Sequence, residues 1–419
     1  MSASDVVDSH LVGGKNVLLV DQGVSFGGAL VVLVSIVKNL KSGYNPTIVS
    51  AIDGDISKWI DIGGDFEVLS RKPAFTYVNR FSAYEKIRKI RSRVVRKLSV
   101  YMLSIYEFFV NLRYVLDLCE IIKKRKIDVV HINNSVYVLM AAAITGTPCV
   151  WHIHGVVEEK RSFLHRLLEP SVSCYLAISN YVSDSAAKHG YPKGKLVTVW
   201  NPVGDQFIEE GCTLSNESRN SDLRERYELA GNAFLIAVFG RIIEWKGQLE
   251  AVKAFAEAKL GDEVYLVLVG GSTEGFGDAY LEEIKKQAKL LGVEKNIIWA
   301  GFVRDVHEVY KDVDLVLHSS IEPEPFGLVV TEAMASGVPI IASKLGAPEE
   351  LVDDGVTGLL VDPRNSTEFS TAIQKVVMDA AFRKLITQSA KISVKENFLP
   401  KQYADRMCEI YDQAISPEK

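Results

Sequence analysis

Residues 314–343 read DLVLHSSIEPEPFGLVVTEAMASGVPIIAS, and the fold is decided by this stretch. Residues 314–319 form an apolar run of strand type, and residues 338–342 form a second one. Residues 328–336 between them contain neither proline nor glycine and end at Gly337, so we expect a helix there. A strand, a glycine turn, a helix and a strand place a helix N-terminus at the carboxyl edge of a parallel sheet, where anionic ligands bind.

Two carboxylates in this stretch occupy different positions. Glu324 lies on the loop before the expected helix, whereas Glu332 lies about one turn inside it. An ionised glutamate among apolar and small residues is costly to bury without a hydrogen-bond donor, and a pair of vicinal sugar hydroxyls is one natural partner. The periodicity of so short a run is equally compatible with an ordinary exposed Glu332.

Length and composition indicate a soluble globular protein of two ordinary domains, with 419 residues, 47% hydrophobic and 24% charged. The cysteines are scattered without CxxC spacing, which argues against a disulfide framework or a zinc site and for a reducing compartment. They are Cys119, Cys149, Cys174, Cys212 and Cys408. Residues 1–15 lack a basic start followed by an apolar core, so we expect no secretory signal. No apolar run reaches the roughly 18 residues that a membrane span requires.

Short apolar strands alternate with helical segments along the chain, which predicts parallel sheets covered by helices. We expect an α/β protein with two such domains facing each other across a cleft, and the polar segment 211–222 reads as a linker or loop. The expected strands are 16–20, 47–51, 128–132, 148–153, 174–178, 196–199, 234–239, 264–269, 297–299 and 358–361, and expected helices include 29–41, 248–259, 280–291 and 306–311.

Charge is distributed unevenly between the halves. The first 200 residues carry 25 basic and 17 acidic side chains, whereas the remainder carries 23 and 36. Residues 71–126 alone hold fifteen basic and four acidic side chains, and aromatic and aliphatic residues follow the basic part around Lys86 to Lys97. This pattern is expected of a helix lying in an anionic membrane interface. A core helix with a solvated basic face is the alternative, and nucleic acid is not expected because its recognisable signatures are absent.

A second motif, GRIIEWKG at residues 240–247, directly follows an expected strand and precedes a helix. It carries Arg241 and Lys246 on a loop at the sheet edge. A diphosphate is held well by a forked guanidinium, an ammonium and a nearby helix N-terminus. Two basic residues in a loop are usually only solvated, but their position on the same edge as Glu324 and Glu332 favours phosphate binding.

Together, GRIIEWKG and EPFGLVVTEAMASGVPIIAS resemble the retaining GT-B glycosyltransferases of family 4, the group 1 glycosyl transferases. The resemblance extends over nearly the whole chain, with a glycine loop at Gly27 and Gly28, WHIHG around His154, AISNYV around Ser179 and VWNPV around Asn201. It implies two Rossmann-like domains. Residues 1–203 would bind the acceptor, 204–396 the donor, and 397–419 would form a helix packing back on the first domain.

The resemblance also implies roles for residues of the second half. Arg241 and Lys246 would hold the donor diphosphate and stabilise the leaving nucleotide. Glu332 would accept hydrogen bonds from the ribose hydroxyls. Glu324 and the backbone N–H groups of Phe326, Gly327 and Leu328 would orient the donor sugar, and the loop around Val303 would meet the nucleobase. No metal motif is present, and neither a metal nor another cofactor is expected.

In the first half, Gly27 and Gly28 would let the loop approach the donor phosphates closely. His152 and His154 are two apart on one strand and point to the same side. A lone strand histidine is more often structural, but the resemblance favours His154 as a catalytic contact to the transferred sugar, beside Glu324, Arg241 and Lys246. No general base is assigned, because the departing phosphate is thought to take the acceptor proton.

Two positions depart from the family pattern. Glu322 offers a competing carboxylate, although only Glu324 keeps the seven-residue gap to Glu332. Asn201 is followed by Pro202 where the family commonly has glycine, so the interdomain turn is expected to differ.

The expected function is transfer of a hexose-type sugar from a UDP- or GDP-sugar to an acceptor hydroxyl with retention of anomeric configuration. The basic first half suggests a lipid-linked or growing surface polysaccharide, such as lipopolysaccharide, as acceptor. The expected location is the cytoplasm, peripherally on the inner face of the plasma membrane. Two alternatives are a nucleotide-sugar epimerase on the same fold and a non-catalytic sugar-nucleotide-binding subunit.

Overall fold

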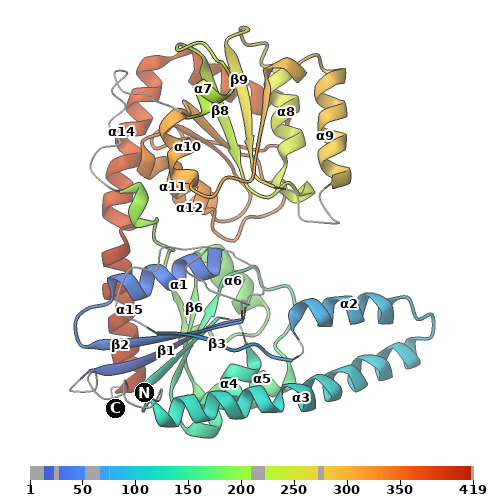
Figure 1. Ribbon diagram of the computed structural model, residues 1–419, viewed down its shortest axis with the longest axis vertical. Coiled ribbons are helices and arrows are strands. Elements are labelled where there is room, and N and C mark those ends of the chain that lie inside the picture. Colours follow the sequence, from blue (N-terminus) through green and yellow to red (C-terminus); the bar gives the residue numbers. More distant parts are fainter. Residues whose placement is uncertain are drawn as a thin grey trace, which may run out of the picture. The chain divides into compact units, whose positions relative to one another are not determined.

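Two separate parallel β-sheets organise the chain (Figure 1). The computed structural model describes residues 14–22, 28–51, 67–74, 76–133, 135–208, 222–271 and 278–416. Gly27, Cys212 and all but the last residue of the polar segment 211–222 lie outside these ranges. Within the described residues, the expectation of two parallel-sheet, Rossmann-like domains is confirmed.

The first sheet has seven strands in the order β3-β2-β1-β4-β5-β6-β7, all parallel. Winding reverses between β1 and β4, which makes that pair the topological switch point. Strand β3 was not predicted, because four residues carry too little periodicity to indicate a strand. The strands are β1 (Lys15–Asp21), β2 (Tyr44–Ser50), β3 (Glu67–Ser70), β4 (Val129–Asn133), β5 (Cys149–Ile153), β6 (Val172–Ala177) and β7 (Leu196–Thr198).

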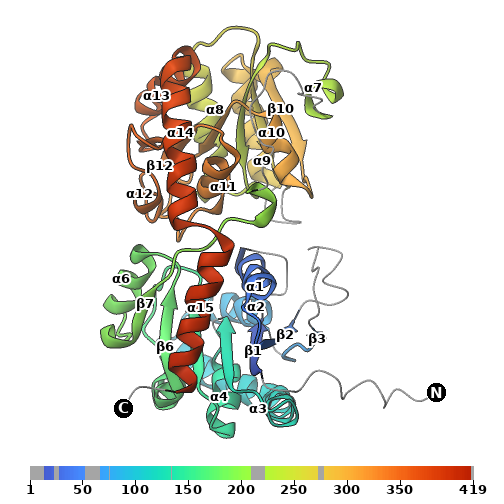
Figure 2. The ribbon, with the colours of Figure 1, turned by 90° about the vertical axis from the view of Figure 1, so that its left-hand side faces the viewer.

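Helices cover both faces of this sheet, since central strands such as β4 and β5 are buried along their whole length. One core joins β1, β4, β5 and β6 to α1 and to Tyr403, Met407 and Tyr411 of α15, which runs along β6 in Figure 2. The helices of this unit are α1 (Gly28–Asn39), α2 (Tyr77–Arg88), α3 (Arg93–Lys124), α4 (Val136–Thr145), α5 (Phe163–Leu168), α6 (Asn180–Lys188) and α15 (Pro400–Ile415).

The basic stretch was expected to form one helix, but it forms two. Its membrane contact stays a prediction. Helix α2 ends at a C-cap on Lys89, and α3 begins after Ser92, whose side-chain oxygen accepts a hydrogen bond from the Val95 N–H. The buried residues of α3 all lie in its second part, from Glu107 to Ile122. The first part of α3 extends away from the sheet together with α2 (Figure 1).

The second sheet has six parallel strands in the order β10-β9-β8-β11-β12-β13, with its switch point between β8 and β11. Its strands are β8 (Phe234–Phe239), β9 (Val264–Val269), β10 (Ile297–Gly301), β11 (Leu315–His318), β12 (Ile340–Ser343) and β13 (Leu359–Val361). Its helices are α7 (Asp222–Arg226), α8 (Gln248–Glu257), α9 (Asp278–Leu290), α10 (Val306–Asp312), α11 (Leu328–Ser336), α12 (Pro348–Leu351), α13 (Ser366–Met378) and α14 (Ala380–Asn397). Helix α11 covers the residues predicted for it, 328–336.

The chain passes between two compact units more than once. The first unit comprises Met1–Ile178, Val182–Val199 and Lys401–Lys419, and the second comprises Ser179–Tyr181 and Trp200–Pro400. The sequence placed the corresponding boundaries after residues 203 and 396. The short piece Ser179–Tyr181, which opens helix α6, therefore belongs to the second unit although its flanking residues belong to the first.

Candidate functional site

The switch point of the second sheet brings two predicted motifs together. Strands β8 and β11 are neighbours, so the loops that follow them leave the same carboxyl edge. The loop after β8 contains the short 3₁₀ turn Glu244–Lys246, and two hydrogen bonds join it to the loop after β11. The Ile321 N–H donates to the Trp245 carbonyl over 2.8 Å, and the Ser319 hydroxyl donates to the Lys246 carbonyl over 2.8 Å.

Lys246 and Glu324 form an ion pair at this edge. The Lys246 Nζ lies 2.7 Å from the Glu324 Oε2, and the two side chains are only 18% and 10% exposed. The same oxygen receives a hydrogen bond of 2.9 Å from the Ser320 hydroxyl and lies 3.2 Å from His318 Nε2. One carboxylate oxygen is therefore surrounded by three side chains, which come from the loop after β8, the end of β11 and the loop after β11.

These neighbours keep Glu324 ionised. Burial alone would raise the pKa of Glu324, but the hydrogen bond with His318 and the positive charge of Lys246 outweigh burial and hold the pKa well below its ordinary range. Glu324 is consequently a carboxylate acceptor with one oxygen, Oε2, bound by its own protein. Lys246 also lies 4.2 Å from the centroid of the Trp245 ring, which restricts its side chain further.

Gly346 packs directly against the backbone of Glu324. The Glu324 N–H donates to the Leu345 carbonyl over 3.0 Å, and the Ala347 N–H donates to the Glu324 carbonyl over 2.9 Å. Between these two bonds, Gly346 has φ +88°, and a Cβ there would lie 2.5 Å from the Glu324 carbonyl oxygen. Any side chain at Gly346 must therefore displace the backbone that carries Glu324.

The family resemblance assigns Glu324 to the donor sugar, so we expect Gly346→Ala to weaken nucleotide-sugar binding at least about tenfold, because the added methyl group pushes Glu324 away from Lys246 and His318. Gly355→Ala is the matched control, since Gly355 has a similar φ of +76° but a Cβ there meets no described atom within 4 Å. Both variants should lose about 1 kcal/mol of stability through the positive φ. Isothermal titration with a nucleotide sugar and thermal unfolding of each variant measure the two effects. Equal donor affinities for the two variants would contradict this expectation.

Helix α11 carries Glu332 beside an aromatic stack. The Tyr310 hydroxyl donates a hydrogen bond of 3.0 Å to Glu332 Oε2. Tyr310 is fixed in turn, since its ring stacks on Phe239 with centroids 4.2 Å apart and meets the edge of Phe207 at 5.3 Å. Burial raises the pKa of Glu332 to about 7, and the hydrogen bond from Tyr310 opposes that rise. Glu332 is thus a partly buried carboxyl group poised to titrate near neutral pH.

The remaining predicted donor residues occupy the loops of the same unit. Arg241 is exposed at the end of β8, and Val303 lies in the loop between β10 and α10. Phe326 is buried, and Gly327 adopts φ +100° at the N-cap of α11, which begins at Leu328. The first N–H groups of a helix have no partner within the helix, so they are available to an anionic or hydroxyl ligand.

His154 and Gly28 lie in the first unit, at the carboxyl edge of its sheet. His154 Nε2 is 3.1 Å from the Asn133 Oδ1, and the Asn133 amide donates a hydrogen bond of 3.2 Å to Asp21. The rings of His152 and His154 lie 3.8 Å apart, as expected for residues on one side of the strand. Burial lowers the pKa of His154 to about 3, so its imidazole is neutral. Gly28 is the first residue of α1.

His131 extends the histidine pair into the core of the first unit. Its Nε2 lies 3.0 Å from His152 Nδ1, and its Nδ1 lies 2.8 Å from the Tyr411 hydroxyl on α15. Burial lowers the pKa of His131 to about 3 and that of His152 well below its ordinary value. His152 is therefore a buried neutral hydrogen-bonding group, whereas His154 stands at the end of the strand, where the sequence placed its contact to sugar.

Two family models match the chain and together span most of it. The model described as "Glycosyl transferases group 1" matches residues 220–393, which contain the Lys246–Glu324 pair. The model described as "Glycosyltransferase Family 4" matches residues 63–207, which contain His154. The chain belongs to the group 1 glycosyltransferases. The family resemblance and the GT-B fold expected from the sequence are thereby confirmed.

Relatives of this glycosyltransferase include enzymes of archaea and bacteria. An uncharacterized glycosyltransferase of Methanocaldococcus jannaschii is 26% identical over 309 residues, which is 69% of this chain and 76% of the relative. The lipopolysaccharide 1,2-N-acetylglucosaminetransferase of Salmonella typhimurium is 31% identical over 207 residues, 48% of this chain and 54% of the relative. The crystal structure of Anabaena HepE in complex with UDP-glucose superposes with a TM-score of 0.72 at 23% identity, covering 95% of this chain and 99% of that one.

Three side chains around the site of this glycosyltransferase were missed by the sequence analysis, namely His318, Ser320 and Tyr310. A signal was present for His318 and Ser320, since polar residues directly after an apolar strand at a switch point face the ligand edge. Among the described residues, no group of three or more His, Cys, Asp or Glu side chains is placed to hold a metal ion.

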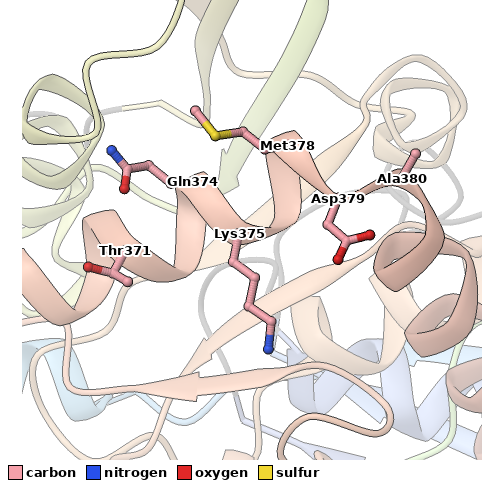
Figure 3. A pocket seen from close by; sticks show the side chains of 6 residues that line it. All are labelled: Thr371, Gln374, Lys375, Met378, Asp379 and Ala380. Carbon is pink, nitrogen blue, oxygen red and sulfur yellow. The ribbon is translucent and has the colours of Figure 1, made fainter.

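A surface hollow of the same unit lies elsewhere. Thr371, Gln374, Lys375 and Met378 line it at the end of α13, with Asp379 and Ala380 at the start of α14 (Figure 3). Helix α13 follows β13, so it begins at the carboxyl edge of the sheet and ends at the opposite edge. The hollow is lined by none of the predicted donor residues and belongs to the amino edge of the sheet.

Proposed function

We propose that this glycosyltransferase moves a hexose-type sugar from a UDP- or GDP-sugar to an acceptor hydroxyl with retention of configuration. The observation that carries the proposal is the Lys246–Glu324 pair at the switch point of the second sheet, with Glu332 on the adjoining helix. A cation that can neutralise phosphate charge, an ionised acceptor for sugar hydroxyls and a second carboxyl group for ribose hydroxyls fit the three parts of a nucleotide sugar. Anabaena HepE, whose fold is similar, was crystallised with UDP-glucose.

In this reaction the bond between the anomeric carbon and the diphosphate oxygen breaks, and a bond forms from the acceptor oxygen to the same carbon. The acceptor proton passes to the departing phosphate oxygen, so no protein base is required. Lys246 and Arg241 stabilise the negative charge that develops on the leaving diphosphate. Glu324 orients the sugar through its hydroxyl groups, and the ion pair with Lys246 couples that orientation to phosphate binding.

Screening nucleoside diphosphate sugars for thermal stabilisation of the protein identifies the donor, because a ligand that binds only the folded state raises the melting temperature. Hydrolysis of the best donor is then followed by proton NMR, with and without a chelator. We expect the first-formed free sugar to keep the donor's anomeric configuration and the rate to survive chelation. Inverted product would contradict the retaining reaction, and isomerised nucleotide sugar without transfer would indicate an epimerase.

We further propose that the enzyme works peripherally on the cytoplasmic face of a membrane, where a lipid-linked glycan is its acceptor. No helix among the described residues is long and apolar enough to cross a membrane. Helix α3, however, exposes a row of large apolar side chains, here called the apolar face of α3. It consists of Val94, Val95, Leu98, Tyr101, Met102, Tyr106, Phe109, Leu112 and Leu116. So extensive an apolar surface marks an interaction site.

The charges near this face favour an anionic lipid surface as its partner. Arg88, Arg93, Arg96 and Lys97 surround a hollow between α2 and α3, and none of the seven described residues that line it is acidic. The other end of α3 is basic too, with Lys123 and Lys124 in its last turn. A second copy of α3 would bring basic ends together in either direction, whereas an anionic lipid surface neutralises both ends.

We expect the double variant Met102→Ser/Phe109→Ser to lose binding to phosphatidylglycerol vesicles at least about tenfold, since each apolar side chain buried in lipid contributes about 1.5–3 kcal/mol. The control is Leu385→Ser/Ile392→Ser on α14, whose side chains are 58% and 59% exposed, compared with 57% and 66% for Met102 and Phe109. Vesicle sedimentation at low salt is the measurement, with phosphatidylcholine vesicles for comparison. Wild-type protein that ignores anionic vesicles would overturn the membrane proposal and leave the donor chemistry standing.

A further inference from the structure

The motifs AISNYV and VWNPV have no part in the proposed chemistry. Ser179 of AISNYV contacts the loop that carries Glu324, and both motifs contact Glu350. We call residues 322–327 the donor loop. The Ser179 hydroxyl donates a hydrogen bond of 2.7 Å to the Pro325 carbonyl, and Ser179 is fully buried. Because Pro325 lies between Glu324 and Phe326, this bond fixes the middle of the donor loop from the side of residue 179.

Backbone hydrogen bonds to residues 345 and 347 also hold the donor loop. The pair of bonds from Glu324 to Leu345 and Ala347 forms an isolated parallel bridge, Glu324 with Gly346. The donor loop is therefore bound between residues 345–347 and Ser179. Ser179 can hold the donor loop in place only if residues 179–181 are themselves held in place.

Glu350 fixes that segment. Its carboxylate accepts hydrogen bonds from the N–H groups of Asn180 over 2.8 Å and Tyr181 over 2.6 Å, at the start of α6. It accepts a third, of 3.2 Å, from the indole N–H of Trp200. A carboxylate at a helix N-terminus is favoured by the helix dipole, and bonds to a charged acceptor are stronger than neutral ones. Trp200 is packed in turn, with its ring stacked on Phe398 at 5.6 Å.

We propose that Ser179 and Glu350 are positioning residues for donor binding, with Ser179 holding the donor loop and Glu350 holding Ser179. Glu350 acts through the backbone of residues 180 and 181 and contacts no substrate. The proposal rests on the donor-binding role given to Glu324. AISNYV and Trp200 have no role in the substrate chemistry. The proposal gives them one, because both donate hydrogen bonds to the carboxylate of Glu350.

The kinetic test compares Ser179→Ala and Glu350→Gln with two matched controls. Glu349→Gln removes the exposed neighbouring carboxylate on the same helix, and Ser173→Ala removes an exposed hydroxyl on β6. We expect each positioning variant to raise the donor KM about tenfold, the effect of one or two lost hydrogen bonds, with kcat changed less. Ser179→Thr, which keeps the hydroxyl, should restore part of the loss. A donor KM equal to that of the controls in both variants overturns the proposal.

Hydrogen exchange of the donor-free protein provides a second measurement. In Glu350→Gln, the amides of Asn180 and Tyr181 and those of the donor loop should exchange faster than in Glu349→Gln, while the sheet amides keep their protection. Unchanged exchange at these amides overturns the proposal even where the KM rises. Because this measurement needs no donor, it tests the positioning roles of Ser179 and Glu350 separately from the donor assignment. A wrong donor assignment would show instead as wild-type protein that binds no nucleotide sugar. If Glu350→Gln does not fold, Ser179→Ala decides, since it removes a single hydroxyl.

Discussion

Lys246→Met should lower kcat for sugar transfer by about 10²–10³-fold, the usual cost of removing one group that stabilises developing negative charge in a water-excluded site. Lys246 is the cation that the fold holds against Glu324, at 2.7 Å and largely buried. Its removal leaves the Glu324 carboxylate buried, with His318 and Ser320 as its remaining side-chain partners in the part of the chain that the structure describes. Loss of one partner of a buried pair costs roughly 3–5 kcal/mol, so the same variant should unfold at a lower temperature.

The double variant Lys246→Met/Glu324→Gln separates these two consequences. It removes the unpaired charge, so its melting temperature should recover most of the loss, while its kcat should stay as low as that of Lys246→Met. The control is Lys285→Met, which breaks a surface pair with Glu282 of similar length, 2.8 Å, but largely exposed. Exposed pairs contribute little, so this control should match wild type. Recovery of transfer activity in the double variant would show that Lys246 acts only by stabilising the fold.

The sequence predicted that Lys246 and Glu324 share an edge, because parallel strands that begin a βα unit end on the same side of a sheet. It did not predict that the two side chains touch. They are 78 residues apart in the chain, and which strands become neighbours depends on how the whole sheet is wound. The same limit applies to Ser179 and Pro325, separated by 146 residues. Residues within one strand–turn–helix unit were placed well, since α11 begins and ends at the residues predicted from Gly327 and Gly337.

The predictions failed where the local sequence pattern was weak or absent. Strand β3 is four residues long, too short for alternation to be visible. The turn between α2 and α3 lies in residues 89–92, within a run of basic and aliphatic residues that contains neither proline nor glycine, so the run read as one helix. Tyr310 was missed for a different reason. Its contact with Glu332 arises from the packing of α10 against α11, which no periodicity of either helix encodes.

Glu332, the acceptor in that contact, is the source of the second large effect, a pH dependence of donor binding, because burial raises its pKa to about 7. In the proposed complex, ribose hydroxyls donate their hydrogen bonds best to an ionised Glu332. Its pKa of about 7 in the donor-free protein means that half the molecules are protonated at that pH. The donor KM should therefore fall about tenfold between pH 6 and pH 8 as the carboxylate ionises. Glu332→Gln should raise the KM at pH 8 and remove this dependence.

The folding stability should decrease as the pH rises from about 4.5 to 7, whereas donor binding strengthens with rising pH. The folded-state pKa of Glu332, about 7, lies above its ordinary value of 4.5, so the folded protein binds the proton more tightly than the unfolded chain. The contribution is fully present below about pH 4.5 and is lost as the pH rises through 7. As the pH rises, donor binding therefore strengthens while the contribution of Glu332 to folding stability weakens. Both changes have one cause, which is the ionisation of a buried carboxyl group that accepts a hydrogen bond from Tyr310.

The variant Tyr310→Phe tests whether Glu332, rather than another titrating group, causes the pH dependence of the donor KM. The Tyr310 hydrogen bond opposes the rise in the Glu332 pKa, so its loss should move the midpoint of the KM–pH curve to higher pH without abolishing the curve. Glu308→Gln, an exposed charge removed from the same helix as Tyr310, should leave the midpoint unchanged. A KM–pH curve that persists in Glu332→Gln would assign the titration to another group. Because His154 has a pKa of about 3, its imidazole stays neutral across pH 6–8 and cannot supply that curve.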